Sequence, residues 1–282
     1  MEGIITRIIS NQYQVTVVDR NYQCIARGKV RQQTRPLVGD KVYFEKFAGQ
    51  YGIEEIKPRK NQLQRPAIAN VDQVLIVMSA SDPEFSATLV DRISFLVNYE
   101  GLSTHLLVTK LDLVVKDDEV YRLIEDYRHN GFQVVDGFDT EALLNLLADK
   151  ITVLAGQSGV GKSSCLNRLN PDFDLKTQEI STALNRGKHT TRFTCLYPIG
   201  EGWVADTPGF SSLDWQNIDP KLFAECISDW REYIGRCKYR NCIHENEPGC
   251  KIKELVSEGK LSQSRYRHYL ECLQLIKNAK GG

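Results

Sequence analysis

The sequence lacks the long apolar run that a membrane-spanning helix needs. The apolar run from Val74 to Met78 is far shorter than the roughly 20 residues that cross a bilayer. The first ten residues, MEGIITRIIS, contain an early acid and no long apolar stretch, so no secretory signal peptide is expected. Internal repeats and low-complexity tracts are also missing, which argues against a repeat protein. These absences favour a cytoplasmic protein that does not bind membranes.

The sequence also has no net charge, but its charges are unevenly distributed. Residues 1–65 contain 12 Lys and Arg against 6 Asp and Glu, residues 66–225 contain 13 against 23, and residues 226–282 contain 11 against 7. Basic ends around an acidic middle suggest that the ends face a polyanion. For any single Lys or Arg, an ordinary solvated position is the alternative.

Patterns of apolar residues divide the chain into regions. Residues 1 to about 60 alternate apolar and polar residues in five short runs, which predicts a small barrel of the OB type, with an SH3-like barrel as the alternative. From residue 71 onward, apolar strands alternate with helical patterns such as Ser86 to Tyr99. This alternation predicts parallel strands joined by crossover helices in a three-layer α/β/α domain.

The stretch GQSGVGKS, Gly156 to Ser163, fits the phosphate-loop pattern G-x-x-x-x-G-K-[ST] between an apolar strand and a helix. Its glycines let backbone N–H groups point into one concavity beside a helix N-terminus, which suits phosphate. We expect Lys162 to reach the β- and γ-phosphates and Ser163 to bind Mg²⁺. A glycine-rich turn without a ligand is the alternative. The predicted phosphate-binding residues are Gly156, Gln157, Ser158, Gly159, Val160, Gly161, Lys162, Ser163 and Ser164.

A second stretch, VTKLD from Val108 to Asp112, favours guanine as the base of the nucleotide. The Asp112 carboxylate can accept hydrogen bonds from guanine N1–H and N2–H₂, and the aliphatic stem of Lys110 can lie over the purine ring. Adenine would leave that carboxylate unpaired, so such a site would reject it. The motif gains weight because it ends an apolar strand, where open α/β sheets carry their ligand loops.

The stretch DTPG, Asp206 to Gly209, matches the D-x-x-G loop, in which the carboxylate orients Mg²⁺ through water and the glycine N–H meets the γ-phosphate. Between the phosphate loop and DTPG, Thr190 or Thr191 is expected to supply a second hydroxyl to Mg²⁺. The order is therefore base loop, phosphate loop, threonine and D-x-x-G. A parallel sheet tolerates such a reordering, because circular permutation moves the termini and keeps the strand arrangement.

Three cysteines and a histidine lie close together in the stretch CKYRNCIHENEPGC: Cys237, Cys242, His244 and Cys250. Three thiolates and one imidazole match a closed tetrahedral structural Zn²⁺ site, with no open position for catalysis. The segment is poor in apolar residues, so metal binding would be coupled to its folding. Scattered core thiols are the alternative interpretation.

The C-terminal stretch SQSRYRHYLECLQLIKNA predicts a helix. Tyr266, Tyr269 and Leu273 would belong to its apolar stripe. Arg265, Arg267 and Lys277 would be left for solvent or RNA. For most of these residues a plain docking helix is the favoured interpretation.

This order of motifs resembles the RsgA (YjeQ/YloQ) family, circularly permuted GTPases that assist assembly of the small ribosomal subunit. The resemblance covers essentially the whole chain, through VGDKV, ANVDQVLIV, TKLD, GQSGVGKSS, RGKHTTR, DTPGF and the cysteine segment. It implies an OB-fold RNA-binding domain (residues 1–64), a permuted P-loop GTPase domain (65–222) and a helical zinc-binding domain (223–282). One departure is Thr109, which opens the base motif where many GTPases have asparagine.

The resemblance also implies an activity: GTP hydrolysis, with Mg²⁺ bound to GTP, stimulated by the small (30S) subunit near the decoding region of its 16S rRNA. Hydrolysis to GDP would accompany a late step of subunit maturation and release of the protein. We expect a monomer. A small-molecule phosphotransferase and an RNA-binding protein with a vestigial nucleotide site are the competing classes.

The residue after DTPG is Phe210, where Ras-like enzymes have the glutamine that orients the attacking water. A phenyl ring cannot orient water, so slow intrinsic turnover is expected and another polar group must act. Our hypothesis is that His189, in the stretch GKHTT, is this catalytic group. A packing or solvent-facing role for His189 is the alternative.

Overall fold

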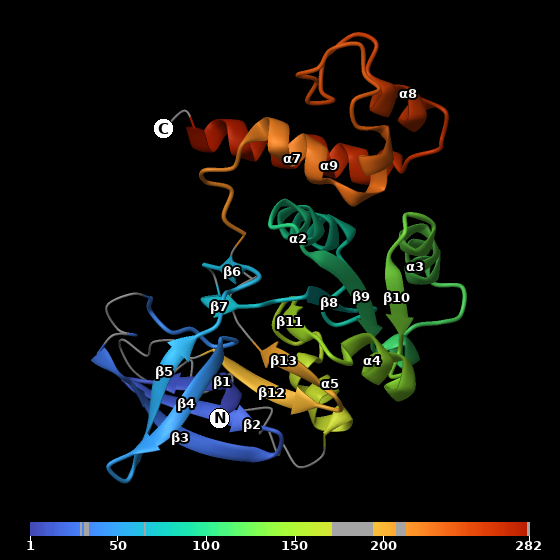
Figure 1. Cartoon of the computed structure of the whole chain (residues 1–282). Coiled ribbons are helices and arrows are strands. Elements are labelled where there is room, and N and C mark those ends of the chain that lie inside the picture. Colours follow the sequence, from blue (N-terminus) through green and yellow to red (C-terminus); the bar gives the residue numbers. More distant parts are fainter. Residues whose placement is uncertain (29, 31–33, 65, 171–193, 207–212, 281–282) are drawn as a thin grey trace. The chain divides into compact units, whose positions relative to one another are not determined.

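A computed structural model describes residues 1–28, 30, 34–64, 66–170, 194–206 and 213–280 (Figure 1). The chain forms two compact units. The first comprises Met1–Leu75, Phe138–Gly156 and Gly161–Ser211, and the second comprises Ile76–Gly137, Gln157–Val160 and Ser212–Gly282. This division differs from the three domains 1–64, 65–222 and 223–282, which stay a prediction.

The first unit begins with the five-stranded barrel that the alternating pattern predicts. Its strands are β1 (Glu2–Ile9), β2 (Gln12–Val17), β3 (Arg20–Ala26), β4 (Lys41–Phe47) and β5 (Gln50–Ile56). They pair in the order β1-β2-β3-β5-β4, with β4 closing on β1 and β3 running parallel to β5. This order is that of an OB barrel, and the parallel pair is foreign to the antiparallel SH3-like alternative. Ile5, Val15 and Phe44 point into the barrel and are fully buried.

Where it is described, the rest of the first unit contains three strands, one of which leads into the phosphate loop, together with two helices and a short hairpin. It contains β6 (Gln62–Leu63), β7 (Ile68–Ala69), α4 (Thr140–Leu147), β11 (Ile151–Ala155), α5 (Lys162–Leu169), β12 (Cys195–Ile199) and β13 (Gly202–Asp206). Strand β11 pairs in parallel with β13, and β13 pairs antiparallel with β12. Strand β12 in turn pairs antiparallel with the barrel strand β1, with Cys195 opposite Arg7. Hydrogen bonding of the sheet therefore continues into the barrel.

Two aspartates fix the segments next to the barrel and this sheet. Asp40, from the stretch VGDKV, is fully buried and accepts hydrogen bonds from Arg59, at 2.7 and 2.8 Å, and from the Leu37 N–H. Asp72, from ANVDQ, accepts a hydrogen bond of 2.8 Å from the N–H of Ile151. Because Ile151 begins β11, the hydrogen bond to Asp72 fixes the start of the strand that leads to the phosphate loop.

The second unit contains the other parallel strands and the C-terminal helices. Its elements are β8 (Gln73–Ser79, which enters it at residue 76), α2 (Ala87–Tyr99), β9 (Ser103–Thr109), η1 (Leu111–Leu113), α3 (Glu119–His129), β10 (Gln133–Asp136), α7 (Pro220–Cys226), η4 (Ser228–Tyr233), α8 (Lys251–Ser257) and α9 (Gln263–Lys280). Strand β9 lies between β8 and β10. The expected helix at Ser86 to Tyr99 is α2, with Ser86 as its N-cap.

The C-terminal helices and α2 share one aromatic core. The Phe223 and Tyr269 rings stack at 5.4 Å, and the Phe95 and Trp230 rings meet Tyr269 edge-on. This packing places α9 along α2, as Figure 1 shows. Of the described helices, none has the length and apolar character that crossing a bilayer requires.

The polar face of α9 differs from its sequence interpretation in one respect. Arg267 is exposed as predicted, and the partly exposed Lys277 forms an ion pair with Glu245. The prediction that Arg265 faces solvent or RNA is wrong, because its side chain is buried and pairs with Asp91 and Asp229. Both partners lie far from Arg265 in the sequence, so helical spacing alone gave no sign of them.

Candidate functional site

The phosphate loop lies between β11 and α5, as its sequence predicts. Gly161 is the N-cap of α5 with φ +95°, a left-handed conformation that strains other residues. The Lys162 Nζ donates a hydrogen bond of 2.8 Å to the Gly156 carbonyl oxygen at the other end of the loop. The loop thus has the turn and the helix N-terminus that phosphate binding needs.

The remaining phosphate-loop residues differ in exposure. Val160 is fully buried, and Gly156 and Gly161 are buried or half-buried. The other predicted phosphate-binding residues are exposed or half-buried: Gln157, Ser158, Gly159, Lys162, Ser163 and Ser164. The hydrophobic Val160 anchors the loop and the polar residues stay accessible.

The base loop, Thr109 to Asp112, begins at the last residue of β9. Thr109 is 1% exposed, and its hydroxyl donates a hydrogen bond of 2.6 Å to the carbonyl oxygen of Val160 in the phosphate loop. Within the second unit, this bond ties the base loop to residues 157–160 of the phosphate loop. Thr109 stands where many GTPases have asparagine, and its hydroxyl connects the two loops in a way that the sequence did not reveal.

The two residues predicted to contact guanine follow directly. Lys110 adopts a left-handed conformation with φ +58°, and its Nζ donates to the carbonyl oxygen of Asp82. Asp112 lies in η1 with an exposed side chain. Asp82, which the sequence interpretation missed, belongs to the loop before α2 and carries no motif of its own.

Several predicted site residues lie outside the described residues: His189, Thr190, Thr191 and Gly209. Asp206 is the last residue of β13, opposite Leu154 of β11 and Cys195 of β12 in the sheet, and its side chain is not among those described. The catalytic and magnesium assignments to these residues therefore stay predictions.

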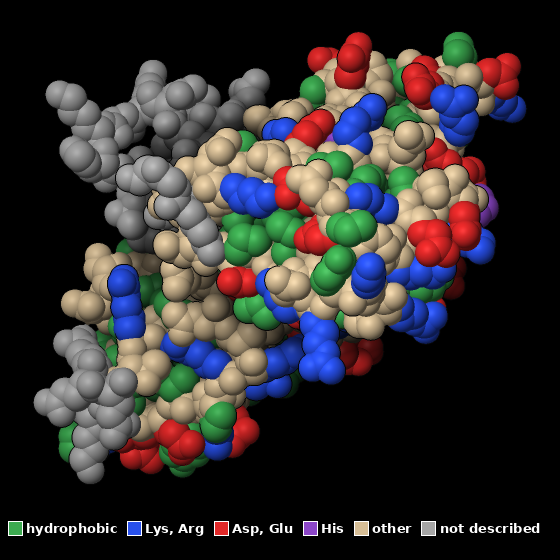
Figure 2. Space-filling model, turned by 90° about the horizontal axis from the view of Figure 1, so that it is seen from above, with side chains coloured by type: hydrophobic (Ala, Val, Ile, Leu, Met, Phe, Trp, Pro, Cys, Tyr) green, Lys and Arg blue, Asp and Glu red, His purple; other side chains and the backbone are tan. Residues whose placement is uncertain are grey.

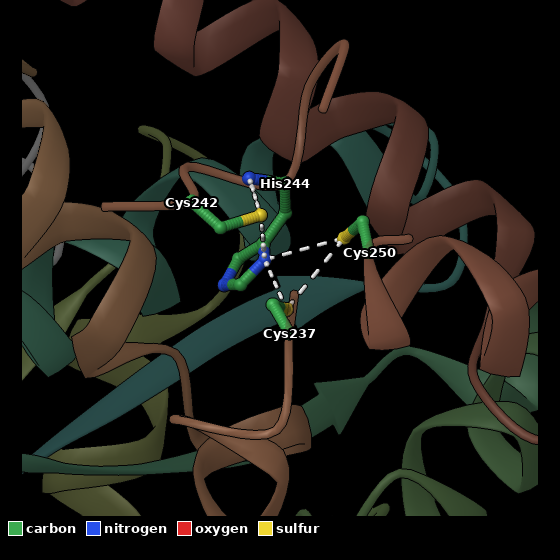
Figure 3. Close-up of side chains that lie close together, drawn as sticks. All are labelled: Cys237, Cys242, His244 and Cys250. Carbon is green, nitrogen blue, oxygen red and sulfur yellow. Dashed lines mark hydrogen bonds between the residues drawn. The ribbon is translucent and has the colours of Figure 1, made fainter. Parts of the chain in front are cut away.

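The four predicted metal ligands converge in the second unit (Figure 3). The Nδ1 atom of His244 lies 3.6, 3.4 and 3.4 Å from the sulfurs of Cys237, Cys242 and Cys250. The sulfurs of Cys237 and Cys250 are 3.9 Å apart, too far for a disulfide. All four ligand atoms lie within 4.8 Å of one another.

These distances fit a tetrahedral zinc ion. Zn–S bonds of about 2.3 Å and a Zn–N bond of about 2.0 Å separate sulfur from nitrogen by about 3.5 Å, and sulfur from sulfur by about 3.8 Å. The cluster has both spacings, with His244 facing the sulfurs through Nδ1. The other ring nitrogen, Nε2, is buried without a hydrogen-bond partner among the described residues.

Burial determines the protonation of the cluster. It lowers the pKa of His244 to about 4, so the imidazole is neutral and able to bind a metal near neutral pH. It raises the pKa of the Cys242 and Cys250 thiols, so in this apolar setting the thiolates need a cation to form. The donor set therefore fits a resident metal ion better than three free thiols.

Helix α9 holds the metal loop through two tyrosines. The hydroxyl of Tyr266 donates to the His244 carbonyl oxygen, and that of Tyr269 donates to the Ile243 carbonyl oxygen. Each of these hydrogen bonds is 2.6 Å long. The N–H groups of His244 and Lys251 point at the sulfurs of Cys242 and Cys237, each at 3.4 Å. The sequence interpretation gave both tyrosines to an apolar stripe and missed these hydroxyl bonds.

Known proteins match the chain from end to end. The RsgA N-terminal domain matches residues 2–53 and the RsgA GTPase domain matches residues 56–216. "Small ribosomal subunit biogenesis GTPase RsgA 2" of Listeria monocytogenes is 42% identical over 99% of both chains. The similarly named RsgA of Halalkalibacterium halodurans is 40% identical, covering 98% of this chain and 97% of the relative.

Solved structures agree. The crystal structure of YloQ, titled a circularly permuted GTPase, superposes with a TM-score of 0.82 at 37% identity, covering 98% of this chain and 95% of that one. YjeQ from Thermotoga maritima gives 0.83 at 33% identity over 98% of both chains. The barrel, the reordered motifs and these matches define a circularly permuted GTPase. The chain belongs to the RsgA GTPase family, which confirms the resemblance drawn from its motifs.

Proposed function

We propose that this GTPase binds the small ribosomal subunit and couples GTP hydrolysis to a late step of its maturation and to its own release. Its curated relatives are named small ribosomal subunit biogenesis GTPases, and the similarity extends over essentially the full length of both chains. The observation that carries the nucleotide part is the bond from Thr109 to Val160, because it ties the base loop to the phosphate loop.

In this proposal the nucleotide is GTP with Mg²⁺. The backbone N–H groups of residues 156–164 and the Lys162 ammonium bind the phosphates, and Asp112 accepts from guanine while Lys110 covers the ring. Ser163, Asp206 and Thr190 or Thr191 would hold the magnesium ion, which would neutralise charge on the phosphates. Gly209 contacts the γ-phosphate through its N–H.

The proposed catalytic group is His189, which would position the attacking water once the subunit is bound. Phe210 cannot do so, since its ring offers no hydrogen bond to water. Replacing His189 by alanine is then expected to abolish most of the subunit-stimulated turnover and to leave GDP affinity unchanged. Unchanged stimulated turnover would reject this role.

We further propose that the barrel contacts 16S rRNA, since residues 1–65 carry a net charge of +6. The C-terminal segment is a weaker candidate for a continuous basic surface. In Figure 2, which looks onto the side where α8 and α9 lie, described Lys, Arg, Asp and Glu side chains are interspersed and neither sign forms a continuous patch. The cluster of Cys237, Cys242, His244 and Cys250 holds one structural Zn²⁺, and the protein acts as a cytoplasmic monomer.

The test is GTP turnover with and without purified small ribosomal subunits. Slow turnover that rises at least tenfold with subunits supports the proposal. ATP turnover at the same rate would reject the role of Asp112, and salt-sensitive RNA binding without any GTP turnover would favour a plain RNA-binding protein.

A further inference from the structure

A group of charged and polar side chains lies in the interior of the second unit, and none of its members is a predicted metal ligand or nucleotide ligand. We name the Arg265 cluster for its members: Asp91, Tyr127, Asp229, Arg265 and His268. Asp91, Tyr127, Arg265 and His268 are at most 4% exposed, and the Asp229 side chain is 3% exposed. They come from four elements: α2, α3, η4 and α9.

Asp91, on α2, is the centre of the cluster. Its Oδ1 accepts hydrogen bonds from Arg265 Nη1 and, at 2.8 Å, from the Tyr127 hydroxyl. Its Oδ2 lies 2.6 Å from His268 Nδ1. Burial raises the pKa of Tyr127, and the Asp91 carboxylate raises it further, so the phenol keeps its proton and stays a donor.

Arg265, on α9, is fixed on every side. Its guanidinium pairs with Asp229 through Nε and Nη2 and contacts the faces of Phe95 and Phe132, at 5.0 and 4.8 Å from the ring centroids. Burial opposes its charge, but Asp229 and Asp91 outweigh that effect and raise its pKa, so it stays charged. Such a buried network specifies one geometry, because a shift of any member leaves a charge unpaired.

The same helix α2 leads back to the base loop. Ser86 caps its first turn, and the loop before it, Ala80 to Phe85, lies against the nucleotide motifs. The Ala80 N–H donates to the Thr109 carbonyl oxygen at 2.9 Å, and Lys110 Nζ donates to the Asp82 carbonyl oxygen. A second contact between α2 and α9 lies in this turn, where Thr88 Oγ1 is 3.1 Å from His268 Nε2.

A simpler interpretation is that the cluster only docks α9 onto α2. The aromatic core around Tyr269 already docks this helix. A docking contact needs no buried ions, since apolar side chains of similar volume often stabilise as well or better. Ions give directional bonds, and these bonds hold Asp91 in the second turn of α2. In the first turn, the Tyr127 hydroxyl donates a hydrogen bond of 3.1 Å to the Ala87 carbonyl oxygen, next to the loop whose Asp82 carbonyl oxygen accepts from Lys110.

We propose that the Arg265 cluster positions the base loop: by fixing the first two turns of α2, it sets the loop before α2, and with it Lys110 and Asp112, for binding the purine. Asp91 and Arg265 are thus positioning residues for guanine recognition, supplied from outside the nucleotide motifs. The inference rests on the proposed function, which assigns guanine to this loop.

The test uses the full-length, zinc-loaded protein with Arg265→Lys, which keeps the charge but loses the fork that pairs with Asp91 and Asp229. The measurements are the Kd values of GDP and IDP, whose base lacks the 2-amino group. We expect GDP affinity to fall about 5- to 20-fold, within the usual range of coupling between sites. The GDP-to-IDP affinity ratio should fall toward one, and KM for GTP should rise while kcat changes less than twofold.

Two further variants separate positioning from folding. Thr88→Val removes only the hydroxyl next to His268 and should shift the GDP-to-IDP ratio in the same direction, even if Arg265→Lys does not fold. Glu271→Gln is the matched control, because Glu271 forms an exposed α2–α9 ion pair with Arg92 at 3.4 Å. It should leave the ratio within twofold of the unmodified protein.

The outcomes distinguish the two proposals. If the unmodified protein prefers GDP to IDP and ADP, but a folded Arg265→Lys or Thr88→Val variant keeps the same ratio, positioning by the cluster is overturned alone. If Glu271→Gln lowers the ratio as much as Thr88→Val, loosening of α9 explains the effect and the inference is again overturned. If the unmodified protein has no preference for guanine, the proposed function fails and the inference fails with it.

Discussion

Replacing Thr109 by valine tests the connection between the base loop and the phosphate loop. Valine has nearly the same shape as threonine, so the change removes the hydroxyl and creates little space. The change removes the bond of 2.6 Å to the carbonyl oxygen of Val160 and a longer one of 3.3 Å to that of Met78. Thr109 is 1% exposed, so water does not readily replace either.

The expected magnitude follows from this burial. A buried acceptor that loses its partner costs about 1–3 kcal/mol, so we expect the free energy of unfolding to fall by about 2 kcal/mol. If the full loss appears in nucleotide binding, GDP affinity falls by about 30-fold, since each 1.4 kcal/mol corresponds to about tenfold. Urea unfolding measures the first quantity, and fluorescence titration with a labelled GDP measures the second.

The matched control is Thr109→Ser, which keeps the hydroxyl and removes one buried methyl group. It should cost about 1 kcal/mol of stability and leave GDP affinity within threefold of the unmodified protein. A Thr109→Val protein that binds GDP as tightly as the Thr109→Ser protein would refute the argument that the hydroxyl joins the two loops.

Three other results are expected. Asp112→Asn should lower GDP affinity about 100-fold and leave ADP binding unchanged, as titration would measure; equal loss for both would contradict its role at the base. Gly161→Ala should cost about 1–2 kcal/mol in urea unfolding, because φ is +95°, whereas Gly28→Ala, which meets nothing within 4 Å, should cost less than half as much. Zinc should be released as the pH falls from about 6.5 toward 4, because His244 takes up a proton more readily in the unfolded loop than in the folded one. A chelating dye would detect the released zinc, and zinc retained down to about pH 4 would contradict this.

The sequence predicts most where a function depends on neighbouring residues. The phosphate loop and the metal loop each lie within a short stretch, so glycine, lysine and cysteine spacing is enough to place Gly161, Lys162 and the four metal ligands. The barrel pattern predicts five strands but not their order, and only the pairing of β3 with β5 distinguishes the OB barrel from its alternative.

The sequence predicts least where partners are distant along the chain. Thr109 bonds Val160 from 51 positions away, and Arg265 bonds Asp91 from 174 positions away. An arginine on a basic helix is usually solvated, which is why the sequence predicted an exposed Arg265, but the side chain is buried. Tertiary packing decided both cases, and helical or strand periodicity carries no information about it.

The pairing of β12 with β1 limits how this protein can be dissected. A fragment without the barrel would leave β12 as an open sheet edge, with unpaired backbone N–H and C=O groups facing solvent. Such an edge invites pairing with other chains, so a truncated GTPase fragment should self-associate, and its reduced activity would reflect aggregation rather than the loss of an RNA contact.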